Sequence, residues 1–335
     1  MNSRERFQAV MSFQPFDRLP LVEWAAWWGK TINRWHTEGF PADLNDRYKI
    51  YDYLGLEIYW QEVVEHNLPD CPKAPSYGAG IIETERDYES IRKYLYPRPA
   101  LKTGDHWKRL ADRQATGEIV LWFSLEGFFG LARELLGIER HLYAFYDQPK
   151  LMHRINSDLS QWILGTIEEI SSYCEPDFMT FFEDMSYNHG SMLSEEHFRE
   201  FLLPYYKIVI PELDRRGIIP IVDSDGDISV PAYWFKEAGL QGILPLERQA
   251  GVDLSRLRRD HPRMLFVGHF DKMTMARGEE TMRAEFERLL PTAAKGGFII
   301  SVDHQTPPGV SLDQYRTYLR LYREYAEKAG AISRS

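Results

Sequence analysis

Short apolar runs alternate along this chain with longer segments in which apolar residues recur at helical spacing. The runs at 218–222 and 298–302 are almost wholly apolar, which is typical of parallel strands buried on both faces. The pattern predicts eight strands, at 18–24, 55–60, 118–124, 177–182, 217–223, 239–246, 263–269 and 296–302.

Helix start and stop signals lie between these runs. Ser194 precedes one helical segment as an N-cap residue, and Gly217 ends it. Pro149 begins a long helix that we expect to reach about residue 174, and Ser311 precedes the last helix, which we expect to end near residue 330.

Eight alternations of strand and helix predict an α/β fold, a (β/α)8 TIM barrel that forms a single domain over residues 1–335. The proline-rich stretch 61–117 is expected to be an insertion after the second strand. A doubly wound open sheet is the alternative, but it would need a glycine-rich phosphate turn after the first strand, and residues 21–28 contain no glycine.

Composition limits the classes of function. The chain has 335 residues, 44% of them hydrophobic, and a net charge of −10 that disfavours nucleic acid as a partner. Its two cysteines have no metal or redox spacing. The first residues have no signal-peptide pattern, and no apolar run is long enough to span a membrane. We therefore expect a soluble cytoplasmic protein without membrane partners.

Acidic residues and histidines follow most of the predicted strands, where the active site of a parallel barrel lies. These candidates are Glu23, Glu126, Glu183, Asp184, Asp223, Asp225, Glu247, His269, Asp303 and His304. Carboxylates gathered in one cleft repel each other, so they require protonation, a basic partner or a bound cation.

A divalent metal is one answer to this repulsion. Asp223 and Asp225 are two residues apart in extended chain, so their side chains point the same way. Together with His304 they offer two carboxylates and an imidazole, a ligand set that suits zinc, manganese or iron, with zinc as the expected ion. Alternatively, the Asp-rich turn 223–227 caps the following helix.

Other candidates have two interpretations each. Glu183 and Asp184 are an acid–base pair or a polar strand end, and His269 is a base, a ligand or a satisfied buried residue. The tryptophans Trp24, Trp27 and Trp60 line an aromatic substrate pocket or belong to the core. Glu126 and Glu247 are expected to contact the substrate.

Several segments resemble the uroporphyrinogen decarboxylase superfamily. Residues 13–20 (Phe-Gln-Pro-Phe-Asp-Arg-Leu-Pro) resemble its opening segment, and 183–205 resembles its fourth strand and following helix. Residues 223–226 (Asp-Ser-Asp-Gly) stand where the family often has His-x-Cys-Gly or His-x-Asp-Gly, and 296–308 resembles the closing strand. The resemblance covers nearly the whole chain and implies a barrel.

The resemblance implies two activities. Uroporphyrinogen decarboxylases work without a cofactor and carry Arg-Gln-Ala-Gly-Arg after the first strand and an Asp on the second. Here the first segment is Trp-Ala-Ala-Trp-Trp, the second strand has no Asp, and only His304 matches a decarboxylase site residue.

Corrinoid-dependent methyltransferases of the superfamily hold zinc at positions that match Asp223, Asp225 and His304, although all three residue types differ. The expectation is a metal-assisted methyltransferase acting on a small molecule, with a corrinoid carrier protein as partner and with a homodimer as the expected assembly. A cofactor-free decarboxylase and a non-enzymatic ligand- or corrinoid-binding protein remain alternatives.

Overall fold

The computed structural model describes residues 1–97 and 104–335. Its main sheet has seven strands in the order β1-β2-β3-β6-β7-β8-β9. These strands are β1 (Ile58–Val63), β2 (Ile119–Glu126), β3 (Phe178–Phe182), β6 (Ile219–Asp223), β7 (Gly242–Leu244), β8 (Leu265–Phe270) and β9 (Phe298–Val302). The order follows the chain, and the sheet is a parallel half-barrel, so the predicted α/β fold class is confirmed.

Helices connect the strands. They are α1 (Ser3–Met11), α2 (Gly29–Thr37), α3 (Arg47–Leu54), α4 (Glu85–Ile91), α5 (Gly104–Ala115), α6 (Gly130–Leu136), α7 (Ile138–Asp147), α8 (Pro149–Ser171), α9 (Glu195–His197), α10 (Leu203–Arg215), α11 (Pro231–Ala238), α12 (Leu254–Asp260), α13 (Glu279–Ala293) and α14 (Leu312–Ser333). Short helical turns are η1 (Arg92–Tyr94), η2 (Phe198–Leu202) and η3 (Lys272–Arg277), and a two-stranded hairpin pairs β4 (Ser186–Tyr187) with β5 (Gly190–Ser191).

The chain divides into two compact units. The first comprises Met1–Trp60, Arg113–Val120 and Ile243–Ser335, and the second comprises Gln61–Asp112 and Leu121–Gly242. The expectation of one domain stays a prediction.

In the second unit, β3 lies between β2 and β6 with parallel register, pairing Thr180 with Ser124 on one side and with Ile221 on the other. The residues of β3 and β6 are almost all buried, as expected for strands covered on both faces. The long helix α8 packs against α10. This packing fixes the carboxyl ends of β2, β3 and β6 beside one another.

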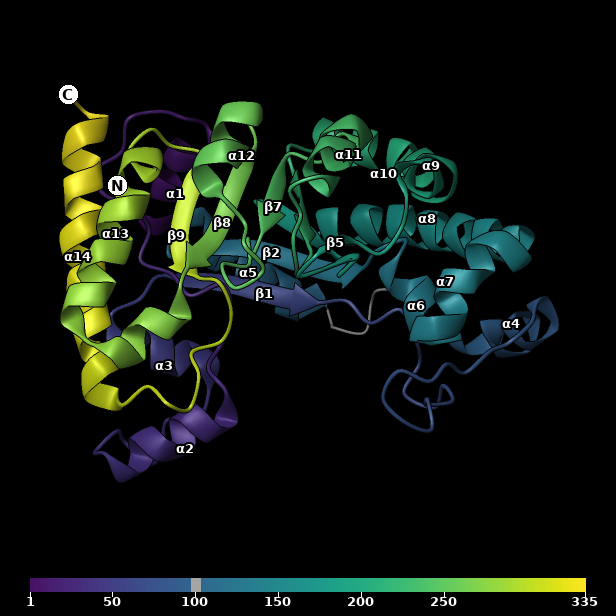
Figure 1. Cartoon of the computed structure of the whole chain (residues 1–335), viewed down its shortest axis with the longest axis horizontal. Helices are drawn as coiled ribbons and strands as arrows, with labels where there is room; N and C mark the ends of the chain where they lie inside the picture. The colour runs from purple at the N-terminus through teal and green to yellow at the C-terminus, as the bar shows by residue number, and fades with distance from the viewer. Residues whose placement is uncertain (98–103) are drawn as a thin grey trace. The chain divides into compact units, whose positions relative to one another are not determined.

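In the first unit, β8 pairs with β9 in parallel register, and α13 packs along α14. The two helices run side by side in Figure 1. A stripe of tyrosines on α14, including Tyr315, Tyr318 and Tyr322, is fully buried, which explains why this helix is held against the unit over its whole length.

The helix signals in the sequence are confirmed. Ser194 accepts a hydrogen bond from the backbone N–H of His197, and Ser311 forms a capping box with Gln314. Pro149 is the first residue of α8. Gly217, with φ +69°, follows α10 in the left-handed conformation that glycine adopts easily.

The first predicted strand, 18–24, is wrong: the structure assigns no strand there. The backbone N–H groups of this extended segment find other partners. Leu19 donates to the carbonyl oxygen of Ala326 in α14, and Trp24 donates to the hydroxyl of Ser301. Because side chains and a helix carbonyl take these bonds, no ladder forms.

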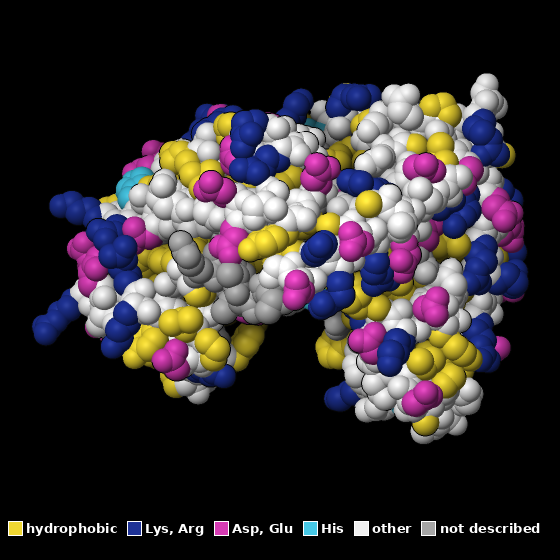
Figure 2. Space-filling view, turned by 180° about the vertical axis from the view of Figure 1, so that it is seen from behind, with side chains coloured by type: hydrophobic (Ala, Val, Ile, Leu, Met, Phe, Trp, Pro, Cys, Tyr) yellow, Lys and Arg dark blue, Asp and Glu magenta, His cyan; other side chains and the backbone are white. Residues whose placement is uncertain are grey.

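The stretch 61–117 contains the end of β1, α4, η1 and α5, together with residues 98–103, which lie outside the described structure. That this stretch is an insertion stays a prediction. Within the described ranges, every helix is either too short or too polar to cross a bilayer. Basic and acidic side chains are interspersed on the face shown in Figure 2, without a continuous basic stripe there.

Candidate functional site

Three carboxylates meet at the carboxyl ends of two neighbouring strands in the second unit. Asp184 lies two residues after β3, Asp223 is the last residue of β6, and Asp225 lies in the turn that follows. Each offers an oxygen atom, and these atoms lie within 4.8 Å of one another. We call Asp184, Asp223 and Asp225 the Asp triad. Asp223 and Asp225, which we expect to share a face, thus lie beside Asp184. The sequence offered Asp184 as a member of an acid–base pair.

Special backbone conformations shape the turn. Asp184 has φ +40°, which is uncommon for a residue other than glycine. Gly226 has φ +84°, and a Cβ atom there would lie 2.6 Å from the carbonyl carbon of Ser186, so only glycine fits. The backbone N–H of Asp225 donates to Asp184 Oδ1 at 3.2 Å. These contacts hold the β3 and β6 turns against each other.

Burial and repulsion by neighbouring carboxylates raise the pKa of two members of the Asp triad, Asp184 and Asp223. Burial, followed by repulsion from Asp184 and Asp225, raises the pKa of Asp223 well above its usual value. Burial, followed by repulsion from Asp225, raises the pKa of Asp184. The guanidinium of Arg133 donates to the Asp184 carbonyl oxygen at 2.8 Å and lies 3.4 Å from its carboxylate. Arg133 thus supplies a positive partner for Asp184.

Glu126 ends β2 beside this cluster. Burial, followed by repulsion from Glu134 and Glu183, raises its pKa to about 8, so it is mostly protonated at neutral pH. A Cβ atom at Gly130 would lie 2.6 Å from Glu126 Oε2, so the carboxyl group occupies space that a larger residue would fill. Sequence analysis placed Glu126 among the substrate contacts, and that role stays a prediction.

Glu183 has a different environment from its neighbour Asp184. It is fully buried, and its carboxylate accepts backbone N–H bonds from Phe128 (2.9 Å), Phe129 (2.7 Å) and Gly130 (3.0 Å). The hydroxyl of Tyr206 also donates to Glu183. Desolvation raises the pKa of Glu183 to about 7. These contacts indicate that Glu183 holds the first turn of α6, which carries Arg133. Its predicted acid–base role is untested.

The first unit contains His304, the remaining predicted metal ligand, and Glu247, which was predicted to contact the substrate. Glu247 follows β7 and His304 follows β9, and a ligand atom of each lies within 4.8 Å of the other. Asp303, next to His304, is fully buried, accepts a hydrogen bond from the backbone N–H of Arg248 at 3.2 Å and lies 3.5 Å from Lys272 Nζ. Carboxylates and imidazole thus occur together at strand ends in this unit too.

His269 is the neutral tautomer with the proton on Nδ1. Nδ1 donates to the Leu246 carbonyl oxygen at 2.8 Å, and Nε2 accepts from Arg288 Nη1 at 3.2 Å. Burial, followed by the positive charge of Arg288, lowers the pKa of His269 to about 4. Both ring nitrogens are occupied, which favours the satisfied buried residue over the base or ligand that the sequence also allowed.

The three tryptophans make structural contacts in the first unit. Trp27 is 7% exposed and packs edge-on against Tyr51 and Tyr315. Trp60 stacks on Tyr48 with ring centroids 4.0 Å apart. Trp24 donates its indole N–H to the Val302 carbonyl oxygen at 2.8 Å. These contacts suit the core interpretation, and a substrate role for the tryptophans stays a prediction.

Sequence analysis noted Glu23 only as one of many strand-end acids. The structure places it, fully buried, between β9 and α14. Its carboxyl group accepts from the Ser301 hydroxyl (2.8 Å), the Val302 N–H (3.2 Å) and the Tyr315 hydroxyl (3.2 Å). Burial raises its pKa to about 7. The i, i+3 spacing of the α14 tyrosines was the available signal for such a network.

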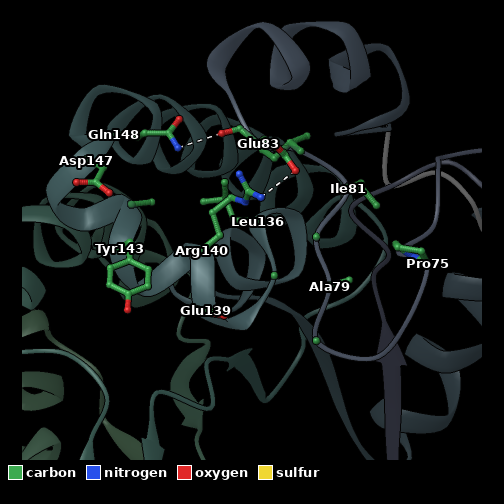
Figure 3. A pocket seen from close by; sticks show the side chains of 15 residues that line it. Pro75, Ala79, Ile81, Glu83, Leu136, Glu139, Arg140, Tyr143, Asp147 and Gln148 are labelled. Atoms are coloured by element: carbon green, nitrogen blue, oxygen red, sulfur yellow. Dashed lines mark hydrogen bonds and ion pairs between the residues drawn. The ribbon is translucent and has the colours of Figure 1, made fainter.

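A cavity of about 680 Å³ lies away from the Asp triad, between α7 and residues 75–83 (Figure 3). Arg140 pairs with Glu83 at 2.8 Å across it, and the Gln148 amide donates to the Glu83 carbonyl oxygen at 3.0 Å. A Cβ atom at Gly80 would lie 2.2 Å from the Leu136 backbone, so the floor of this cavity is closely packed backbone. Its charged side chains are exposed, and we assign it no function.

The residues of the Asp triad fit a divalent cation. Three carboxylate oxygens within 4.8 Å are hard ligands, and a doubly positive ion would relieve the repulsion that raises the pKa of Asp223. A parallel α/β sheet with acidic residues at its strand ends is the arrangement of a barrel-type enzyme.

The comparisons identify which such enzyme family this is. The family model described as "Uroporphyrinogen decarboxylase (URO-D)" matches residues 70–325, more than half of the chain. The chain therefore belongs to the uroporphyrinogen decarboxylase family of enzymes.

Two curated relatives are named "Uroporphyrinogen decarboxylase". The protein from Chlorobium chlorochromatii is 23% identical over 221 residues, which are 61% of this chain and 60% of that protein. The protein from Bordetella parapertussis is 26% identical over 193 residues, 52% of this chain and 51% of that protein. The chain thus spans only about half to three fifths of these relatives.

Among solved structures, a "methyltransferase from Methanosarcina mazei" matches with a TM-score of 0.66 at 13% identity, covering 97% of this chain and 99% of that one. At this identity the likeness shows the fold, and the activity of that protein is not carried over by it.

Proposed function

We propose that this chain is a methyltransferase that moves a methyl group between a corrinoid held by a partner protein and a small molecule, with a divalent cation at the Asp triad. The observation that carries this proposal is the convergence of three carboxylates within 4.8 Å at the ends of β3 and β6. The methyltransferase fold match supports the choice within the family.

Asp184, Asp223 and Asp225 of the second unit would hold the cation. The bound cation would act as a Lewis acid that makes an oxygen or nitrogen atom of the small molecule easier to deprotonate or to release. Oxygen-rich ligands suit zinc and manganese, and they are less suited than thiolates to activating a thiol. We therefore favour an acceptor or donor that is not a thiol.

The rest of the second unit would keep this site rigid. Arg133 orients Asp184 through its carbonyl oxygen and carboxylate. Glu183 ties down the turn from which α6 begins, and thereby the helix that carries Arg133. The close approach at Gly226 fixes the backbone between Asp225 and the β4 strand.

The test uses methylcobalamin as the methyl donor and a panel of small alcohols, amines and thiols as acceptors. Transfer breaks the cobalt–carbon bond, which changes the visible absorption of the corrinoid. We expect transfer with the wild-type protein, a loss of at least about 10-fold in Asp223→Asn, and no loss in Asp227→Asn. Asp227 is the matched control because it lies in the same turn but is not part of the Asp triad. Its carboxylate accepts a hydrogen bond from the backbone N–H of Ser229.

A decarboxylase is the second candidate, because both curated relatives carry that name. It needs no cation and no corrinoid. Release of CO2 from a carboxylated substrate, by protein that is free of metal and that transfers no methyl group from methylcobalamin, would favour it over our proposal.

A further inference from the structure

A second cavity, of about 490 Å³, lies directly after β1 in the second unit. We call it the β1 cavity. It is enclosed by the segment 65–74, by Ile81, and by Glu134 and Leu135 of α6. The backbone N–H groups of Ile81 and Ile82 both donate to the Leu135 carbonyl oxygen, at 2.7 Å and 3.0 Å, so residues 80–83 are tied to α6. This cavity is distinct from the one in Figure 3, which lies between α7 and residues 75–83.

The walls of the β1 cavity are partly apolar and partly polar. Leu68, Ile81 and Leu135 give it apolar surface. Cys71 also lines it and is 7% exposed; within residues 1–97 and 104–335 its thiol has no hydrogen-bond partner. A buried thiol behaves as a small apolar group, so Cys71 adds to the apolar wall of the cavity.

His66 adds a neutral imidazole to this wall. It is 3% exposed, and its Nε2 lies 3.3 Å from the Asn67 amide nitrogen and 3.7 Å from Glu134. Burial lowers the pKa of His66 to about 4, so it carries no charge at neutral pH. His66 therefore does not balance the carboxylates of this cavity.

The charge of the β1 cavity is negative. Glu65 and Glu134 both line the cavity, and burial, followed by repulsion from Glu65, raises the pKa of Glu134. Lys73 also lines the cavity, on its exposed side, and in the described structure it forms no ion pair with either of them. Two carboxylates and one lysine line the cavity, and the guanidinium of Arg133, whose positive charge acts on Glu134, forms its ion pair with Asp184.

The β1 cavity and the Asp triad lie at the same end of the sheet. The cavity follows the carboxyl end of β1, and Glu126 ends the adjacent strand β2. Repulsion from Glu134 contributes to the raised pKa of Glu126, which in turn contributes to that of Asp223. The β1 cavity therefore lies at the strand that neighbours β2, at the same edge of the sheet as the Asp triad.

We propose that the β1 cavity binds a small organic amine with an apolar body, its ammonium group between Glu65 and Glu134 and its carbon skeleton against Leu68, Ile81 and Leu135. This inference rests on the proposed function in one respect: it makes the amine the small molecule on which the methyltransferase acts. Its binding part stands on the cavity alone.

Binding is tested on the full chain by isothermal titration calorimetry with three probes that carry the same 3-methylbutyl group and differ in their polar end. These are 3-methylbutylamine, 3-methylbutan-1-ol and 4-methylpentanoate. We expect the amine to bind at least about 10-fold more tightly than the alcohol, and Glu134→Gln to remove that preference. Glu139→Gln is the matched control, because Glu139 lines the cavity of Figure 3 and is exposed. Equal binding of amine and alcohol, or an amine affinity unchanged in Glu134→Gln, would overturn the proposal.

Cys71 gives a second readout. Cys174→Ser leaves Cys71 as the one thiol of the chain, and its alkylation by iodoacetamide can be followed by mass spectrometry. We expect saturating 3-methylbutylamine to slow alkylation at least about fivefold, because the ligand fills the space in front of the thiol. An unchanged rate would place the amine elsewhere and refute the assignment.

These measurements need neither a metal nor a corrinoid. Methyl transfer to a neutral acceptor, without amine binding, would refute the inference and leave the proposed function standing. Amine binding in a protein that transfers no methyl group from methylcobalamin would refute the proposed function and leave the binding part of the inference standing.

Discussion

Glu183→Gln tests whether Glu183 holds the start of α6. In the native protein Glu183 Oε1 accepts from the Phe128 N–H and the Tyr206 hydroxyl, and Oε2 accepts from the Phe129 and Gly130 N–H groups. Glutamine keeps one carbonyl oxygen, and the Tyr206 hydroxyl can accept from its NH2 group, so at least one backbone N–H group would be left facing that NH2 group. A buried donor left without an acceptor costs about 1–3 kcal/mol, which gives an expected loss of about 2 kcal/mol in the free energy of unfolding.

Urea unfolding followed by circular dichroism measures this loss as a lower transition midpoint at unchanged slope. The matched control is Glu134→Gln on the same helix, whose side chain is 50% exposed and which we expect to change stability by less than about 1 kcal/mol. A loss below about 1 kcal/mol in Glu183→Gln would mean that the turn is held by other contacts, and the positioning role would be refuted.

Two further predictions concern substrate and pH. Uroporphyrinogen incubated with the purified protein should be recovered unchanged, because residues 24–28 have no arginine to hold its carboxylates; formation of coproporphyrinogen, detected by chromatography, would contradict this. The pKa of buried Glu23 rises from 4.5 to about 7 on folding, so the folded state binds the proton more tightly, and its stabilising contribution is full below about pH 4.5 and is lost as the pH rises through about 7. The free energy of unfolding should thus fall by about 3 kcal/mol over this range relative to Glu23→Gln, and parallel pH profiles from thermal melts would refute the coupling.

The fold was largely predictable because burial on both faces leaves continuous apolar runs in the sequence. Seven of the eight expected strands are present, and the run at 218–222 became the core of β6. The segment 18–24 has the same apolar character, yet it forms no ladder because Ser301 and the carbonyl of Ala326 take its N–H groups. Hydrogen bonds to residues this far away in the chain leave no pattern in the local sequence.

The site was predictable only in part. Asp223 and Asp225 were found because they follow a buried strand two residues apart. That Asp184 joins them depends on its left-handed backbone and on the pairing of β3 with β6, neither of which the sequence reveals. In the sequence, Glu183 and Asp184 are two adjacent acidic residues with the same predicted role. In the structure, the Glu183 carboxylate accepts three backbone N–H bonds from a turn more than fifty residues earlier.

The most direct test of the account is the metal affinity of the Asp triad. Protein stripped of metal is titrated with zinc and with manganese, and the bound ion is counted by mass spectrometry. We predict one ion per chain, an affinity at least about 10-fold lower in Asp225→Ala, and an unchanged affinity in Asp227→Ala. Failure of the wild-type protein to bind either ion, or an affinity in Asp225→Ala equal to that of the wild type, would contradict the central claim.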